Sequence, residues 1–387
     1  MEDLRAMLGE PPEAVARQCS TAKPAWLAEI ERAFTASHPR PFPRSLDCAE
    51  AGSQAGFLEA VRPLLDSGYS RLVAELRSLP GQTPERLAPL LARQIQLHLL
   101  LLLSRTLVLE LHLASQAGQL SGATEEERFQ SFVERLRDPE AALALLHQYP
   151  VLARQVAETI GQWVSYSLEI VDHLAADRDR LRAVFSPAGD LGELREVRTG
   201  LGDAHRAGRS VALLRFESGL GLIYKPRSVA VEVAFQDLLD WTGARGFAPA
   251  FRRLKLIDGG DYGWVQLVEA APCTDEAELE RFYLRQGGYL ALLFVLSATD
   301  MHSENLIAAG EHPFLVDLEA LFHPADQALG RVVEGAAFPD TVLRVGFSAQ
   351  RGQHGSAGPG WRRSQWPNRA RRAGPGPPGA AGRALRH

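Results

Sequence analysis

The residues with the clearest chemical potential lie in one short stretch, 298–307, and at a carboxylate beyond it. In this stretch Asp300, His302 and Asn305 are spaced two and three residues apart, and Asp317 follows on the far side of a predicted hairpin. In kinases an Asp orients or deprotonates the accepting hydroxyl, while an Asn and a second Asp hold the metal ions that neutralise the phosphates. The spacing therefore predicts phosphoryl transfer. The alternative is a polar loop between a helix and a hairpin, because short motifs often carry no function.

A second group of candidate residues precedes this stretch. Two β-rich runs, 210–216 and 221–224, are joined by a Gly-containing turn and predict a β-hairpin. The Gly-rich segment 199–209 opens a strand rather than a helix, which excludes a P-loop and a dinucleotide-binding fingerprint. Lys225 ends the second strand, and Arg227 adds another cation. In a kinase-like site we expect both to bind ATP phosphates, whereas a lysine there can also simply keep an edge strand soluble.

The elements between these two groups must position them. A helix predicted over 229–241 carries Glu232, a candidate ion-pair partner of the strand lysine, and the runs 251–257 and 262–268 predict a second antiparallel pair. A long helix over 275–299 starts acidic and becomes fully apolar, so we expect it to deliver the catalytic-type loop from inside a second lobe. The order of these parts along the chain matches the order in a kinase.

The chain upstream is helical. From residue 57 to about 185 the apolar residues recur at helical spacing, and Thr124 before three glutamates predicts a helix cap. The predicted helices include one over 84–116, one over 151–177 and a short separate one over 178–185. We therefore expect an α+β protein, with a helical N-terminal region before a two-lobed kinase-like core. The expected parts are a mixed helical and irregular N-terminal segment (1–56), a helical region (57–190), an N-lobe-like sheet (191–272), a partial C-lobe with the catalytic loop (273–347) and a disordered Gly/Pro/Arg-rich tail (348–387).

Composition limits the classes of function. The 387 residues carry a net charge of −5, with 42 basic and 47 acidic residues. Eight arginines and no acidic residue lie in 351–387, so the remainder has 42 − 8 = 34 basic residues and a charge of −13. We expect no nucleic-acid binding, because phosphate contacts need clustered basic residues. Three scattered cysteines form no metal-ligand cluster, so we expect no zinc.

The most apolar segment, 97–113, is interrupted by Arg105 and Glu110. Because charges near the middle of a membrane span are costly and the uninterrupted stretch is short, we predict a buried core helix and no membrane span. The N-terminus lacks the basic and then apolar pattern of a secretory signal, so we expect a cytoplasmic protein.

Several segments together resemble a known family, the dehydratase part of class II (LanM-type) lanthipeptide synthetases. The resemblance covers roughly residues 57–344. The segments that carry it include GLGDAHRAGRSV, GLIYKPRSVAVEVAFQDLLDW, DYGWVQLVE, LRQGGYLALLFVLSATDMHSENLIA and FLVDLEALFHP. The resemblance implies a lipid-kinase-like core that uses ATP and Mg²⁺ to phosphorylate Ser and Thr of a precursor peptide with a leader segment. Elimination of the phosphate then gives dehydroalanine and dehydrobutyrine.

The resemblance also implies roles for the candidate residues. Lys225 would hold ATP phosphates, and Asp300 would orient or deprotonate the peptide hydroxyl with assistance from His302. Asn305 and Asp317 would bind magnesium, with Glu319 nearby in a DLE sequence. Asp203 and His205 match a further motif of the same site, so the resemblance implies that they are catalytic, without a specific role for either.

The chain departs from the family pattern after about residue 347. Family members continue with an Arg and a Thr for phosphate elimination and then with a zinc-binding cyclase domain, and neither is visible. We therefore expect a truncated protein with an incomplete C-lobe, impaired elimination, no cyclase activity and a separately encoded cyclase as a partner. The alternative is a non-catalytic remnant, or a module that binds a peptide or a nucleotide. A generic lipid or small-molecule kinase is disfavoured by the long helical N-terminal half.

Overall fold

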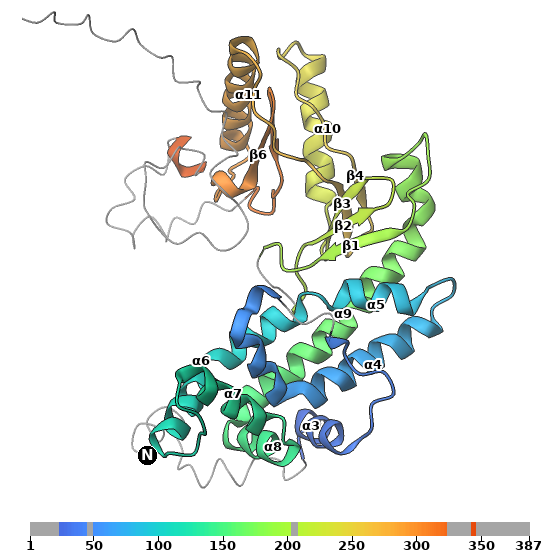
Figure 1. Ribbon diagram of the computed structural model, residues 1–387. Coiled ribbons are helices and arrows are strands. Elements are labelled where there is room, and N and C mark those ends of the chain that lie inside the picture. The colour runs from blue at the N-terminus through green and yellow to red at the C-terminus, as the bar shows by residue number, and fades with distance from the viewer. Residues whose placement is uncertain (1–22, 45–48, 203–207, 323–341, 346–387) are drawn as a thin grey trace, which may run out of the picture. The chain divides into compact units, whose positions relative to one another are not determined.

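The computed structural model in Figure 1 describes residues 23–44, 49–202, 208–322 and 342–345. The chain divides into two compact units, Met1–Pro226 and Arg227–His387. Each unit combines α-helices with antiparallel strands, in agreement with the expected α+β class. The predicted tail 348–387 lies outside the described residues.

Helix α9 is the central element of the first unit, and α3, α4, α6 and α8 all pack against it. The helices among the described residues of this unit are α3 (Ala25–Thr35), η2 (Ala49–Val61), α4 (Arg62–Ser78), α5 (Pro84–Ala92), α6 (Ile95–Gln116), α7 (Glu125–Leu136), α8 (Pro139–Gln148) and α9 (Pro150–Phe185). The close packing of α4 on α9 depends on Gly68, because a Cβ there would lie 2.5 Å from Cγ2 of Ile160. The helix cap predicted at Thr124 is present at the start of α7, where Thr124 and Glu127 form a capping box.

Some predicted helix boundaries were wrong. We expected a break between Asp177 and Arg178, but α9 is one helix of 36 residues, because buried Leu181 and Phe185 continue its apolar face. The helix predicted from Pro84 to Gln116 is instead two helices, separated at residues 93–94.

The apolar helix α6 is not the fully buried core helix that its composition suggested. Leu99, Leu103 and Leu107 are buried on one face. Several large apolar side chains on the helix are exposed, namely Leu101, Val108, Leu109 and Leu113. Among the described residues, Pro84–Gln116 is one stretch long and apolar enough to cross a membrane by length and composition, and 28% of its most apolar window is buried. One such stretch is weak evidence for a span, since core helices pass the same test.

Three antiparallel strands complete the first unit: β1 (Leu194–Arg198), β2 (Ala212–Phe216) and β3 (Gly221–Lys225). Strands β2 and β3 confirm the predicted hairpin. Strand β1 was not predicted, because its sequence, LREVR, is mostly charged. Strand β1 pairs with β2, and Val197 lies opposite Leu214. Its charged side chains are typical of an edge strand, because charges there discourage pairing with another chain.

The second unit contains helices α10 (Ala230–Ala244) and α11 (Glu276–Val295), strands β4 (Leu256–Asp258), β5 (Gly263–Gln266), β6 (Leu306–Ala309) and β7 (His312–Leu315), and the short helices η3 (Ser303–Asn305) and η5 (Val342–Val345). Its core joins both long helices to the β6–β7 hairpin through Phe235, Tyr289, Leu293 and Leu315. Helix α11 ends four residues earlier than predicted. Ser297 adopts a φ of 53°, and the Ala298 N–H donates to the Leu293 carbonyl, as in a left-handed helix C-cap.

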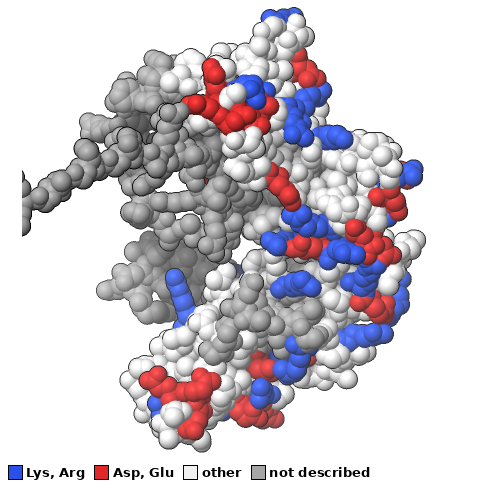
Figure 2. Space-filling model, turned by 45° about the horizontal axis from the view of Figure 1, so that its top comes forward, with Lys and Arg blue, Asp and Glu red and all other residues white. Residues whose placement is uncertain are grey.

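Charged side chains of both signs are interspersed on the face of the molecule shown in Figure 2. Among the described residues on this face, blue and red groups alternate at short intervals.

Candidate functional site

The loop that carries Asp300 and His302 is anchored on both sides of Asp300. Ala298 and Met301 are buried in the core of the second unit, with 0% and 1% of their surface exposed. The Met301 N–H also donates to the Val345 carbonyl at 2.9 Å. In contrast, the side chains of Asp300 and His302 are 75% and 45% exposed. Core packing thus fixes the loop while its two candidate catalytic groups stay open to a substrate.

Asp300 holds an unusual backbone conformation. Its φ is 59°, in the left-handed region that residues other than glycine rarely adopt. The side-chain Nδ2 of Asn305 donates to the Asp300 carbonyl at 3.0 Å and so holds this conformation in place. Strained backbone of this kind is common at functional sites, where the surrounding structure must stabilise it.

The His302 imidazole is oriented by the next turn of the chain. His302 caps η3, and its Nδ1 accepts the Glu304 N–H at 3.3 Å. An imidazole that accepts at Nδ1 carries its proton on Nε2 in the neutral form. This Nε2 lies 3.8 Å from Oδ1 of Asp300, which puts an N–H donor beside the candidate general base.

Asn305 and Asp317 flank the open end of the β6–β7 hairpin. The Val316 N–H donates to the Asn305 carbonyl at 3.1 Å, next to the pair Leu306 and Leu315 in the strand register. Because Nδ2 of Asn305 is bonded to the loop backbone, its side-chain oxygen is the atom left for a ligand. An amide oxygen and a carboxylate are hard oxygen ligands of the type that Mg²⁺ prefers, with phosphates and water as the remaining ligands.

No group of three or more His, Cys, Asp or Glu suited to a metal ion occurs in the part of the chain that the structure describes. The donor set at the hairpin therefore fits a magnesium ion that also binds phosphate oxygens. The remaining ligands of such an ion would be water molecules or phosphate oxygens.

Arg227 is surrounded by three carboxylates. Its Nη2 lies 2.8 Å from Oε1 of Glu232 and 2.8 Å from Oδ1 of Asp317, and its Nε lies 3.5 Å from Oε2 of Glu319. Burial acts to lower the pKa of Arg227, but the three carboxylates outweigh burial and raise it. The prediction from the sequence considered Glu232 as a partner of Lys225 and did not consider this network around Arg227.

The segment that follows Arg227 is fixed by β4 and β5. Oδ1 of Asp258 accepts the Ser228 hydroxyl at 3.0 Å and the Val229 N–H at 2.8 Å. Gly263 allows Val229 to approach the strand closely, since a Cβ at this glycine would lie 2.3 Å from Cγ2 of Val229. Arg227 is therefore presented from a backbone whose position is set by several contacts.

Lys225 lies at the end of β3 in the first unit and is 5% exposed. The residue before it, Tyr224, is buried, and its hydroxyl donates to Oε1 of Glu169 at 3.1 Å and lies 2.8 Å from Nδ1 of His173. Arg209 donates to the other oxygen of Glu169 at 2.8 Å. This polar network ties the end of β3 to helix α9.

Two of the candidate residues, Asp203 and His205, lie outside the described residues. The candidates of the second unit are linked by direct contacts: Asp300 with His302 and Asn305, and Asp317 with Arg227. Their roles in catalysis stay predictions.

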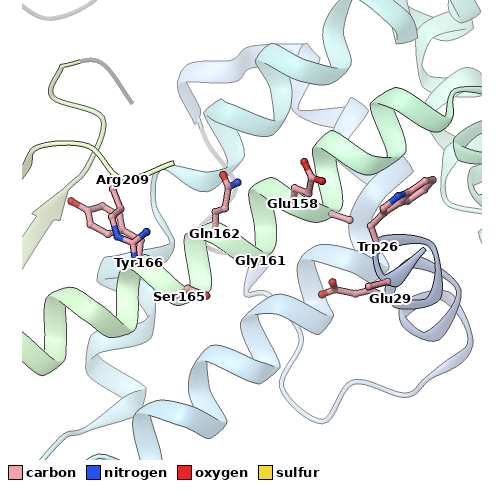
Figure 3. A pocket seen from close by; sticks show the side chains of 10 residues that line it. Trp26, Glu29, Glu158, Gly161, Gln162, Ser165, Tyr166 and Arg209 are labelled. Carbon is pink, nitrogen blue, oxygen red and sulfur yellow. The ribbon is translucent and has the colours of Figure 1, made fainter. Parts of the chain in front are cut away.

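A separate pocket lies in the first unit between α3 and α9 (Figure 3). Its volume is about 560 Å³, and Trp26 and Glu29 lie at one end while Tyr166 and Arg209 lie at the other. The residues that line it are Ala25, Trp26, Glu29, Ala157, Glu158, Gly161, Gln162, Ser165, Tyr166 and Arg209. The sequence analysis missed this pocket. Its signal was the spacing of four between the small residues Ala157, Gly161 and Ser165, which leaves a shallow strip on α9.

Comparison with protein families gives one match, to a domain of unknown function (DUF4135), over residues 149–357. These 209 residues are more than half of the 387-residue chain. The chain belongs to the DUF4135 family. The matched DUF4135 region contains every candidate residue, including the two that the structure does not describe.

This DUF4135 protein is also similar to the lacticin 481/lactococcin biosynthesis protein LcnDR2 of Lactococcus lactis subsp. lactis. The two are 25% identical over 230 residues, which cover 57% of this chain and 24% of the relative. The chain thus spans about a quarter of the relative's length. The match supports the resemblance to LanM-type proteins that the motifs indicated.

Proposed function

We propose that the chain acts in lanthipeptide biosynthesis as an ATP- and Mg²⁺-dependent kinase of Ser and Thr in a precursor peptide. Phosphorylation is the first step of dehydration in the family that the sequence resembles. The observation that carries the proposal is the anchored loop, in which Asn305 bonds the strained backbone of Asp300 and His302 lies beside its carboxylate. The biosynthetic role of the similar lactococcal protein supports the peptide substrate.

In the proposed reaction, the oxygen of a peptide hydroxyl attacks the γ-phosphorus of ATP. The bond from this phosphorus to the β–γ bridging oxygen breaks, ADP leaves, and the hydroxyl proton passes to the Asp300 carboxylate. His302 presents its Nε2 proton beside this carboxylate and assists there, and Lys225 binds the phosphates. Asn305 and Asp317 would hold Mg²⁺, which would neutralise phosphate charge when bound.

The test is incubation with ATP, Mg²⁺ and a precursor peptide encoded beside the gene, followed by mass spectrometry of the peptide. We expect a phosphorylated peptide, and we expect Asp300→Asn to slow its formation by about 10²–10⁴-fold, the contribution of a general base. Lys225→Met should also abolish phosphate transfer, because the phosphates lose their cation.

Glu304→Gln is the matched control. Glu304 is exposed in the same loop, and its side chain has no assigned part in the reaction. Transfer at the normal rate by both Asp300→Asn and Lys225→Met would rule out the proposed roles. A chain that binds Mg-ATP but phosphorylates no peptide would instead favour a nucleotide-binding module.

A further inference from the structure

The guanidinium of Arg227 contacts the carboxylates of Glu232, Asp317 and Glu319. Glu232 is buried, with 5% of its side chain exposed, and it lies in the first turn of α10, where the helix dipole favours a negative charge. Arg227 therefore links a buried carboxylate of α10 to the partly exposed carboxylate of Asp317.

One nitrogen of Arg227 joins carboxylates from two separate elements. Nη2 contacts Glu232 in α10 and Asp317 just after β7, each at 2.8 Å. At Asp317 the contact is to Oδ1, which also accepts the Glu319 N–H at 3.4 Å. The hydrogen bonds of Asp317 within the described residues thus fall on Oδ1 and leave Oδ2 for a ligand.

We propose that Arg227 is a positioning residue for the cation ligand Asp317. By holding Oδ1 against α10, Arg227 presents Oδ2 to a divalent cation. This inference rests on the proposed function, because it assigns a partner to the magnesium ligand of the same site. Carboxylates that bind metals are themselves held by hydrogen bonds, and loss of such an outer partner typically lowers metal affinity by 10–100-fold.

The position of Arg227 is set before any ligand binds. Asp258 fixes the backbone of Ser228 and Val229, and the Gly263 contact seats Val229 on the strand. A guanidinium held in this way keeps a carboxylate in one orientation, whereas the point charge of a lysine ammonium does not. A role in orientation and a role in charge alone therefore predict different outcomes for a lysine at this position.

The test measures the binding of Mn²⁺ alone, as a probe for Mg²⁺, to the full chain by electron paramagnetic resonance. We expect Arg227→Lys to weaken Mn²⁺ binding by about 10–100-fold although it keeps the charge. Arg227→Gln should also weaken binding, and Asp317→Asn should abolish it at this site. Circular dichroism and a melting curve without metal establish that each variant is folded.

Arg253→Lys is the matched control, because Arg253 also bridges two carboxylates of this unit, those of Asp237 and Asp240, on an exposed surface. Its Mn²⁺ affinity should equal that of the wild type. Unchanged affinity in Arg227→Lys, or tighter binding in Arg227→Gln, would show a role in charge alone and overturn the inference while the proposed function stands. Unchanged affinity in Asp317→Asn would overturn the magnesium site and the inference together.

Discussion

Two clusters of arginine and carboxylate in the second unit are built in opposite ways. Around Arg227, one guanidinium contacts three carboxylates. Around Glu311, one carboxylate oxygen binds two arginines: Arg285 donates to Oε2 at 2.8 Å, and Arg281 bonds the same oxygen.

The second cluster has the features of a structural contact. Arg285 is buried, and it also donates to the backbone carbonyls of Ala250 at 2.8 Å and of Glu311 at 2.8 Å. It therefore joins α11 to the turn of the β6–β7 hairpin, and the carboxylate of Glu311 neutralises its charge. The comparison teaches that burial of an arginine does not by itself mark a site. Arg227 differs because one of its partners is Asp317, the candidate magnesium ligand at the end of the hairpin.

The largest expected difference between the clusters concerns catalysis. Asp317→Asn should lower phosphate transfer to peptide by at least about 10²-fold, the scale of one lost stabiliser of transition-state charge. Glu311→Gln, the equivalent change in the structural cluster, should leave the transfer rate within a few-fold of the wild type. Initial rates of the two variants at one Mg-ATP concentration that saturates the wild type check this, and equal losses in both would remove the distinction.

For stability we expect the opposite ranking, with the larger loss in Glu311→Gln and the smaller loss in Asp317→Asn. We expect Glu311→Gln to lower the free energy of unfolding by about 1–3 kcal/mol, because it removes the charged partner of buried Arg285. Asp317 is 40% exposed, so Asp317→Asn should cost about 1 kcal/mol or less. Urea unfolding followed by circular dichroism gives both values. A larger loss at Asp317 would show that the Arg227 cluster is the structural one.

A smaller effect should appear in the pH dependence of stability. Hydrogen bonds from Arg281 and Arg285 lower the pKa of Glu311 from 4.5 to about 2. Because the folded-state pKa is the lower one, the stabilisation from Glu311 is fully present above pH 4.5 and is lost as the pH falls toward 2. The stability difference between the wild type and Glu311→Gln should therefore shrink over this range in urea titrations. A constant difference would contradict this assignment.

Much of the site could be predicted because its residues are close in sequence. Asp300, His302 and Asn305 lie within six residues, and the strand-like runs beyond them placed Asp317 on the other side of the hairpin. The hydrogen bond of Asn305 to the Asp300 backbone was not predicted, since it depends on a left-handed φ that no spacing rule requires.

Contacts between distant segments were harder to predict. Arg227 and Asp317 are 90 residues apart, and nothing in the local pattern pairs them. In the helices, periodicity gave the element type but not its ends. The polar sequence after Asp177 hid the continuation of α9, because the buried Leu181 and Phe185 are separated by charged residues that face solvent.

The most direct test of the account is the thermal shift caused by Mg-ATP in the wild type, Asp317→Asn and Glu311→Gln measured side by side. A ligand that binds the folded state raises its stability by mass action, by about 2.7 kcal/mol at a concentration of 100 Kd. We predict a rise in Tm for the wild type and a rise of the same size for Glu311→Gln from its lower starting Tm, with little or no rise for Asp317→Asn. A full rise in Asp317→Asn would contradict the assignment of the site.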